Sequence, residues 1–441
     1  MIRLFRVFIP VSSITLLLSE ALWIAASFIV ACYLVLPVDP TDYLLNDGGL
    51  IRISAILLGI LLGLHFQDLY SKIRVKSRIL LAQQLCLAMG VAFLLQGLLT
   101  YVNIELRLPI RVMAAGTLLS ILVIFCWRLI FSAYAARVMG RERLLLVGSS
   151  PVLADIARHL DEHPDQGMVV IGFVDDARNM ESPSSAAKVL GPIAAVREIV
   201  EATRPDRVVV GMSERRSRVP VNDLLDLRFG GQVIEEAAAT YERVLSRVCV
   251  KELRPSQLIY SGELGPSRPT VMTYQRIAHA VIAGIAIVAT VPLMLFSIVV
   301  LWLTSAGPVI SRQQRVGLNG TPFTLYRFRL ARPGGLLRQL GLDGLPQLFN
   351  VLAGNMAIVG PRPERPEFVK ELGEQIPYYR QRHSVRPGLT GWAQINYEHE
   401  STREDVITNL EYDLYYIKNM SMGLDTYIIF HTIKAMLLSR R

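Results

Sequence analysis

The chain has few charged residues, few cysteines and no motif that reads nucleic acid. Charged side chains make up 19% of its 441 residues and apolar ones 52%, which is too apolar for an ordinary soluble enzyme. The cysteines lack zinc-site spacing and three lie in apolar runs, so we interpret them as packing residues. The net charge is +9, but the chain has no motif that reads nucleic acid, and we predict no nucleic-acid partner.

What the chain does have is long apolar runs, each long enough to cross a bilayer as a helix. Because no small-residue cleavage site follows the first run, we expect it to be a retained membrane helix. Glu20 and Asp68 are too few acids for a transporter's proton relay. Arg128, near the end of the fourth run, is expected to snorkel to the interface. The runs are residues 11–36, 50–69, 79–101, 112–134 and 277–304.

The first four runs predict a four-helix transmembrane bundle over residues 1–137. Basic residues lie between the second and third runs and after the fourth, whereas the loop after the first run is acidic. By the positive-inside tendency, the N-terminus and the segment after residue 137 face the cytoplasm. Arg107 and Arg111 are a weaker counter-signal. The basic residues that carry this prediction are Lys72, Arg74, Lys76, Arg78, Arg137, Arg141 and Arg143.

Residues 143–262 alternate between short apolar strands and amphipathic helices, which predicts a parallel, doubly wound, Rossmann-like α/β domain. The turn after the first strand begins Gly148-Ser-Ser-Pro and is not the G-x-G-x-x-G of a dinucleotide site. Asp175 and Asp176 end the second strand, where a ribose-binding acid would lie. We favour a structural or regulatory domain, and cofactor binding stays open. The expected strands are 143–148, 169–176, 207–212 and 232–236.

The fifth run is interrupted by Pro292, which removes a backbone donor and forces a kink or a break. Thr290 is expected to bond a carbonyl that the proline frees. Either the helix spans the membrane with a kink, or it turns back as a re-entrant helix. We favour re-entry, because a full span would place residues 305–441 and their arginine-rich motifs outside.

Two motifs in this last segment point to phosphate chemistry. Residues 342–368 read LDGLPQLFNVLAGNMAIVGPRPERPEF, and residues 382–396 read RHSVRPGLTGWAQIN. Arginine binds two phosphate oxygens at once through its planar fork, and the neighbouring prolines would hold it rigidly. We therefore select Arg362, Arg365 and Arg386 as phosphate-binding residues. Weaker candidates are Arg315, Arg327 and Arg329.

Together with residues 307–329 and 410–419, these motifs resemble the bacterial polyprenyl-phosphate hexose-1-phosphate transferases, most of all the large PEP-CTERM-associated exopolysaccharide type. The resemblance implies a mostly helical sugar transferase domain over residues 273–441, with a Pro-broken re-entrant helix at 277–304. It also implies a UDP-sugar donor, undecaprenyl phosphate as acceptor, and a location in the bacterial inner membrane with the catalytic domain cytoplasmic. We also consider that such a protein forms a homodimer through its α/β domain.

The resemblance further implies a phospho-Asp intermediate on Asp343 and a Mg²⁺ ion. We expect this chain to hold the metal with Asp343 together with Glu364, Glu367 or Glu398. The chain departs from the family pattern at Gly344, where the family has Glu, and at Asn355, where it usually has Asp. The loop between residues 329 and 342 is also short. Two further interpretations therefore stay open beside the enzyme: a catalytically impaired scaffold or regulator of polysaccharide assembly, and a nucleotide sensor acting through the α/β domain.

Overall fold

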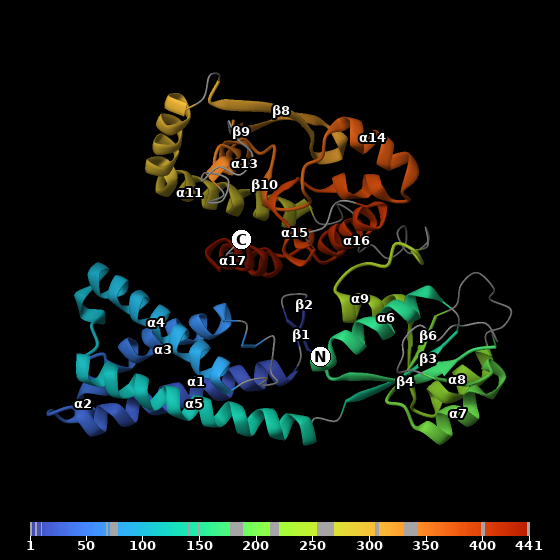
Figure 1. Ribbon diagram of the computed structural model, residues 1–441, viewed down its shortest axis with the longest axis horizontal. Helices are drawn as coiled ribbons and strands as arrows, with labels where there is room; N and C mark the ends of the chain where they lie inside the picture. Colours follow the sequence, from blue (N-terminus) through green and yellow to red (C-terminus); the bar gives the residue numbers. More distant parts are fainter. Residues whose placement is uncertain are drawn as a thin grey trace. The chain divides into compact units, whose positions relative to one another are not determined.

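The computed structural model describes most of the chain (Figure 1). The described residues are 2–4, 7–9, 11–67, 69–70, 78–138, 141–148, 150–176, 188–211, 220–253, 269–304, 308–329, 342–397 and 402–438. Asp68, Lys72, Arg74, Lys76, Glu398 and the short loop at 330–341 lie outside them. The chain forms two compact units, one of residues 1–2, 9–144 and 160–171, the other of residues 3–8, 145–159 and 172–441.

The first unit contains the helical bundle. Each of the four predicted N-terminal runs is a helix, with α1 packed on α5 and α3 on α4. These four helices and α11 are long and apolar enough to cross a membrane, which makes the chain a membrane protein. The bundle helices are α1 Val11–Val35, α2 Pro40–Leu45, α3 Gly49–Phe66, α4 Arg78–Val102 and α5 Ile110–Val138, with η1 Ile104–Leu106 before α5 and two N-terminal strands, β1 Ile2–Leu4 and β2 Val7–Ile9.

The expectation that Arg128 snorkels is wrong. Its side chain is 3% exposed, and its Nε lies 2.6 Å from Oε1 of Glu20, which is fully buried on α1. A second nitrogen donates to the carbonyl oxygen of Leu69 at 2.9 Å. Both charges are buried because α1 and α5 pack together there, and a buried charge needs a partner. The pair therefore ties two bundle helices to each other.

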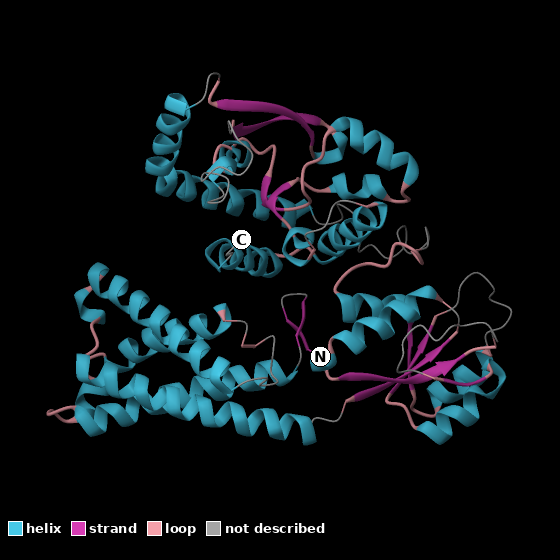
Figure 2. Ribbon diagram, viewed as in Figure 1, coloured by secondary structure: helices cyan, strands magenta, loops and turns pink. Residues whose placement is uncertain are grey.

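The α/β region forms a five-stranded sheet in the order β5-β4-β3-β6-β7 (Figure 2). The β4–β5 and β6–β7 pairs are parallel, and the doubly wound Rossmann-like prediction is confirmed. The last four residues of β3 are buried, as expected for a strand covered on both faces. The strands are β3 Glu142–Val147, β4 Met168–Val174, β5 Val189–Gly191, β6 Arg207–Val210 and β7 Val233–Glu236; the helices are α6 Pro151–Glu162, α7 Val196–Thr203, α8 Val221–Phe229 and α9 Ala237–Leu245, with η2 Pro164–Gln166 and η3 Ile193–Ala195.

The fifth apolar run is α11, Pro269–Thr304, with Pro292 inside it. Its ribbon changes direction between its two ends (Figure 1), as expected for a helix interrupted by proline. Thr290 donates to the carbonyl oxygen of Ala286 at 2.6 Å. The expectation that Thr290 bonds the freed carbonyl is wrong, because the carbonyl one turn before the proline belongs to Val288. Re-entry into the membrane stays a prediction.

The transferase segment combines two small sheets with mostly helical structure. β8 Ile310–Val316 and β9 Pro322–Phe328 form an antiparallel hairpin. β10 Ala357–Val359 and β11 Gly388–Thr390 pair in parallel. The remaining elements are η5 Leu318–Gly320, η6 Leu342–Gly344, α13 Gln347–Leu352, α14 Pro366–Gln375, η7 Tyr379–Ser384, α15 Trp392–Asn396, α16 Arg403–Asn419 and α17 Met422–Leu438.

Candidate functional site

The β8–β9 hairpin places two arginines on one face. Arg327 lies opposite Ser311 in the register, and Arg315 lies opposite Phe323. Because side chains alternate along a strand and opposite residues share a face, Arg315 and Arg327 project to the same side of the hairpin. Arg312, one position away from Ser311, projects to the other side and is exposed.

Asp343, the predicted nucleophile, lies in the short helix η6 and is paired with one of these arginines. Nη2 of Arg327 donates to Oδ2 of Asp343 at 2.7 Å, and the carboxylate is 15% exposed. In the described part of the chain, Nε of Arg327 is buried and has no hydrogen-bond partner. A buried N–H without a partner is costly unless a ligand accepts it. Arg327 can therefore hold the carboxylate with one nitrogen and a substrate oxygen with another.

Arg315 connects the hairpin to the turn that carries the predicted phosphate-binding arginines. Its Nη1 donates to the carbonyl oxygen of Pro363 at 3.1 Å, and the amide of Val316 donates to the carbonyl of Glu364 at 2.9 Å. Like Nε of Arg327, Nε of Arg315 is buried without a partner among the described residues. Burial lowers the pKa of Arg315, and its arginine neighbours lower it further while Glu364 opposes them. These neighbours are Arg365, Arg362 and Arg327.

The arginines and Asp343 thus form one cationic cluster, consisting of Arg315, Arg327, Arg362 and Arg365 with Asp343 and Glu364 at its edges. The side chains of Arg362 and Arg365 are exposed, so they are accessible to an anion from solvent. Four guanidinium groups beside two carboxylates leave a net positive charge, which suits a nucleotide or lipid phosphate.

The turn at 360–364 is fixed by the pairing of β10 with β11. The amide of Gly360 donates to the carbonyl of Thr390, and the amide of Gly388 donates to that of Pro361, both at 2.9 Å. Arg382 holds the turn at Arg362, because its Nη2 donates to the carbonyl oxygen of that residue at 3.4 Å. Arg382 is not among the residues predicted from the sequence, although the motif RHSVRPG contains it.

Two predicted arginines lie apart from the cluster. Nε of Arg386 donates to the carbonyl oxygen of Gly354 at 3.0 Å. Burial lowers the pKa of Arg386, and the positive charge of Arg276 on α11 lowers it further. Arg386 and Arg276 thus form a second cationic pair, of which the sequence analysis named only one member. Arg329 lines a separate cavity together with Arg312 and Tyr326.

The three predicted metal ligands that the structure describes do not gather into one group. Asp343 is paired with Arg327, and Glu367 is exposed at the start of α14. Within the described ranges, no three His, Cys, Asp or Glu side chains come together. A Mg²⁺ ion is usually held by one or two carboxylates together with substrate phosphates. Asp343 and Glu364 both lie at the edge of the cationic cluster, and Gly344 beside Asp343 supplies no further carboxylate.

Gly344 has room for a Cβ atom. Among the described residues, a Cβ atom built on it would meet only Nε2 of Gln347, at 3.5 Å, which is an ordinary van der Waals contact. The backbone therefore does not require a glycine at this position.

Family models and known proteins match this chain in two regions. The bacterial sugar transferase family matches residues 270–333 and 329–439, and a CoA-binding domain matches residues 65–225. An Aeromonas hydrophila protein named UDP-N-acetylgalactosamine-undecaprenyl-phosphate N-acetylgalactosaminephosphotransferase is 39% identical over 44% of this chain and 50% of its own length. A UDP-glucose:undecaprenyl-phosphate glucose-1-phosphate transferase of Xanthomonas campestris pv. campestris is 29% identical over 65% of each chain.

A shorter relative is matched by this chain over nearly the whole of the relative's own length. The Bacillus subtilis (strain 168) uncharacterized sugar transferase EpsL is 36% identical over 38% of this chain and 89% of its own length. For the two larger relatives, the chain spans half to about two thirds of their length.

Proposed function

Since this chain belongs to the bacterial sugar transferase family, we propose that it transfers a hexose-1-phosphate from a UDP-sugar to undecaprenyl phosphate. The product would start an exopolysaccharide or another lipid-linked glycan. The observation that carries the proposal is the pairing of Asp343 with Arg327 at the edge of the cationic cluster. The apolar helices favour a multi-pass protein of the bacterial inner membrane, with the transferase domain on the cytoplasmic side.

The proposed reaction has two displacements at one phosphorus atom. A carboxylate oxygen of Asp343 attacks the phosphorus bonded to the sugar, and the bond to the bridging oxygen breaks, so UMP leaves. An oxygen of undecaprenyl phosphate then attacks the phospho-Asp phosphorus. The acyl phosphate bond breaks, the carboxylate of Asp343 is regenerated, and the lipid carries a diphosphate-linked hexose.

In this reaction the arginines bind and orient the phosphate groups. Arg327 orients the carboxylate of Asp343, and its Nε, which has no partner among the described residues, donates to an oxygen of the attacked phosphate. Arg315 offers a second such Nε, also without a partner in the described part of the chain, from the same face of the hairpin. Fixed donors of this kind stabilise the charge that develops on the phosphate oxygens in the transition state.

Mg²⁺ stays a prediction that rests on the family resemblance alone. When bound, it would neutralise phosphate oxygens. Because Asp343, Glu364 and Glu367 do not gather into a metal site among the described residues, no step of the proposed reaction is assigned to the metal.

The experiment that tests the proposal is release of UMP by the purified protein in lipid particles, with UDP-hexoses, undecaprenyl phosphate and Mg²⁺. Asp343→Asn and Gly344→Glu are measured beside the parent. Release that disappears in Asp343→Asn would support transfer through a single carboxylate. Release that is unchanged in Asp343→Asn would overturn the assignment of the nucleophile.

A second candidate is a catalytically impaired family member that scaffolds or regulates polysaccharide assembly. Gly344 favours it, because the position beside Asp343 has room for a Cβ atom but carries no carboxylate. In this case the parent would release no UMP, and Gly344→Glu would restore release. Turnover by the parent that depends on Asp343 would exclude this second candidate.

A further inference from the structure

Residues 246–253, which we call the docking segment, follow α9 and lie against the transferase part of the chain. The amide of Val248 donates to the carbonyl oxygen of Glu411 on α16 at 3.1 Å. Nε1 of Trp392 donates to the carbonyl oxygen of Ser246 at 2.8 Å. The α/β domain and the transferase domain are thus joined here by backbone hydrogen bonds as well as by side chains.

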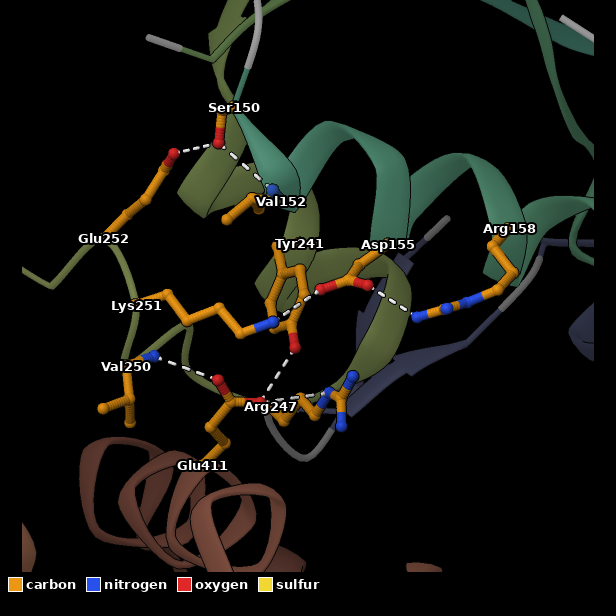
Figure 3. A network of polar contacts seen from close by, with 10 residues as sticks. All are labelled: Ser150, Val152, Asp155, Arg158, Tyr241, Arg247, Val250, Lys251, Glu252 and Glu411. Carbon is orange, nitrogen blue, oxygen red and sulfur yellow. Dashed lines mark hydrogen bonds and ion pairs between the residues drawn. The ribbon is translucent and has the colours of Figure 1, made fainter. Parts of the chain in front are cut away.

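Glu411 is a buried carboxylate whose partners come from α9 and the docking segment (Figure 3). The hydroxyl of Tyr241 donates to Oε2 at 2.8 Å, and the amide of Val250 donates to Oε1 at 3.1 Å. Nε of Arg247 lies 3.4 Å from Oε2. Burial raises the pKa of Glu411, and Arg247, Tyr241 and Val250 oppose that rise. Moving Glu411 away would leave a buried acid and its donors without partners, which is costly.

The same helix carries a second buried carboxylate that reaches the candidate site. Asp413 lies two residues after Glu411 and therefore on nearly the opposite side of α16. Its Oδ2 lies 2.8 Å from Nη2 of Arg382. Arg382 in turn donates to the carbonyl of Arg362 and lies 4.0 Å from Glu364. Helix α16 is thus held by the docking segment on one side and holds the 360–364 turn on the other.

We propose that Glu411 is a positioning residue, through which the docking segment fixes α16 and, by way of Asp413 and Arg382, the phosphate-binding turn at 360–364. This inference rests on the proposed function, since the turn matters as part of the transfer site. A helix moves largely as a rigid rod, so a loosened Glu411 displaces Asp413 as well. Misplacing a catalytic group by about 1 Å can cost roughly a hundredfold in rate.

The docking segment also has contacts that stay within the α/β domain, and these supply a matched control. Nζ of Lys251 lies 3.2 Å from Asp155 on α6, and Glu252 accepts a hydrogen bond from the hydroxyl of Ser150 (Figure 3). Lys251→Ala therefore removes an ion pair of the same segment and no hydrogen bond to α16; the charge of Lys251 acts on Glu411 only through space, where it lowers the pKa of that carboxyl. Tyr241→Phe removes one hydrogen bond to Glu411 and keeps the aromatic ring, so the fold is retained.

The test is hydrogen exchange of the full-length protein in lipid particles, followed by mass spectrometry, for the parent, Tyr241→Phe, Glu411→Gln and Lys251→Ala. We expect Tyr241→Phe and Glu411→Gln to speed exchange in peptides covering 360–364 and 379–386, although no atom was changed there. Lys251→Ala should leave these peptides at the parental rate. UMP release, measured in parallel, should fall about tenfold in kcat/KM for Tyr241→Phe, as for one lost hydrogen bond, with a higher KM for the UDP-sugar because the turn that carries Arg362 is displaced.

The outcomes separate this inference from the proposed function. Faster exchange confined to the docking segment and the start of α16, with 360–364 unchanged, would overturn the inference even in an active enzyme. A parent protein that releases no UMP would count against the proposed function, whereas the exchange data would still decide whether Glu411 controls the turn.

Discussion

Gly388 of β11 lies against the backbone of Gly360 so closely that neither residue can carry a side chain. A Cβ atom on Gly388 would collide with the amide nitrogen of Gly360, and one on Gly360 would collide with the carbonyl oxygen of Arg386. The two glycines belong to the motifs GPRP and RPGLTG, which are separate in the sequence. Their close approach is what brings both motifs to one place and holds Arg362 on a rigid turn.

Gly360→Ala is therefore expected to destabilise the transferase domain by about 1–3 kcal/mol, the usual cost of overpacking. The same change should weaken UDP binding, because the turn carrying Arg362 has to shift. Thermal unfolding and UDP titration of the protein in lipid particles measure the two effects. Gly344→Ala is the control for stability, since its Cβ would make only an ordinary contact. Equal midpoints for the two variants would contradict the argument.

Arg327→Ala tests the partner of Asp343. The change removes the 2.7 Å contact to the carboxylate and the unpartnered Nε that we assign to the substrate phosphate. We expect UMP release to fall by roughly a hundredfold or more, as for the loss of one preorganised donor. Arg312→Ala, on the other face of the same hairpin, should stay near the parental rate. A similar loss in both variants would point to the hairpin's fold rather than to Arg327.

Much of the architecture could be predicted from the sequence, because the apolar pattern that indicates a helix or a strand is formed by residues that are neighbours in the chain. The apolar runs gave the four bundle helices and α11, and the alternation of strands and helices gave the parallel sheet. Strand β5 was missed, since Val189–Gly191 is only three residues long and carries no periodicity. The start of α16 is set by a capping box of Thr402 and Asp405.

The candidate site could be predicted only in part from the sequence, because its ion pairs and hydrogen bonds join residues that are distant in the chain. Asp343 was predicted as the nucleophile, a role that stays a prediction, and the structure places its carboxylate beside Arg327. Nothing in the local pattern, however, indicates that Arg382 pairs with Asp413, since the contact exists only once α16 has packed on η7. Arg315, a weaker candidate by sequence, proves to connect the hairpin to the turn.

The buried pair of the bundle gives a prediction for the membrane domain. Glu20→Ala leaves Arg128 buried and without its counter-charge, which typically costs about 3–5 kcal/mol. Replacing both residues, in Glu20→Gln with Arg128→Met, should cost less than Glu20→Ala alone. Thermal unfolding in lipid particles gives the comparison. Arg52→Ala is the control, because Arg52 is a half-buried bundle arginine bonded to the carbonyl of Glu105 rather than to a carboxylate. A double variant less stable than Glu20→Ala would contradict the pairing.

His383 is expected to make the protein less stable in acid. It is 8% exposed, its ring lies edge-on to Tyr379, and its Nε2 has no hydrogen-bond partner among the described residues. Burial and, to a smaller extent, the charge of Arg382 together lower the pKa of His383 to about 4. An unfolded chain takes up this proton near pH 6.5, whereas the folded protein does not until about pH 4. The unfolded state therefore binds more protons in this window, and stability falls as the pH is lowered through it.

The measurement is the midpoint of thermal unfolding from pH 7.5 to 4 for the parent and His383→Phe. The lowered pKa of His383 corresponds to a loss in the free energy of unfolding on the order of 3 kcal/mol between pH 6.5 and pH 4. Other titrating groups are common to both proteins, so the difference between the two pH profiles reports His383. We expect the profile of His383→Phe to be flatter between pH 6.5 and 4, because phenylalanine keeps the edge-on contact with Tyr379 and carries no proton to gain. Parallel profiles over this range would show that the folded protein protonates His383 as readily as the unfolded chain does.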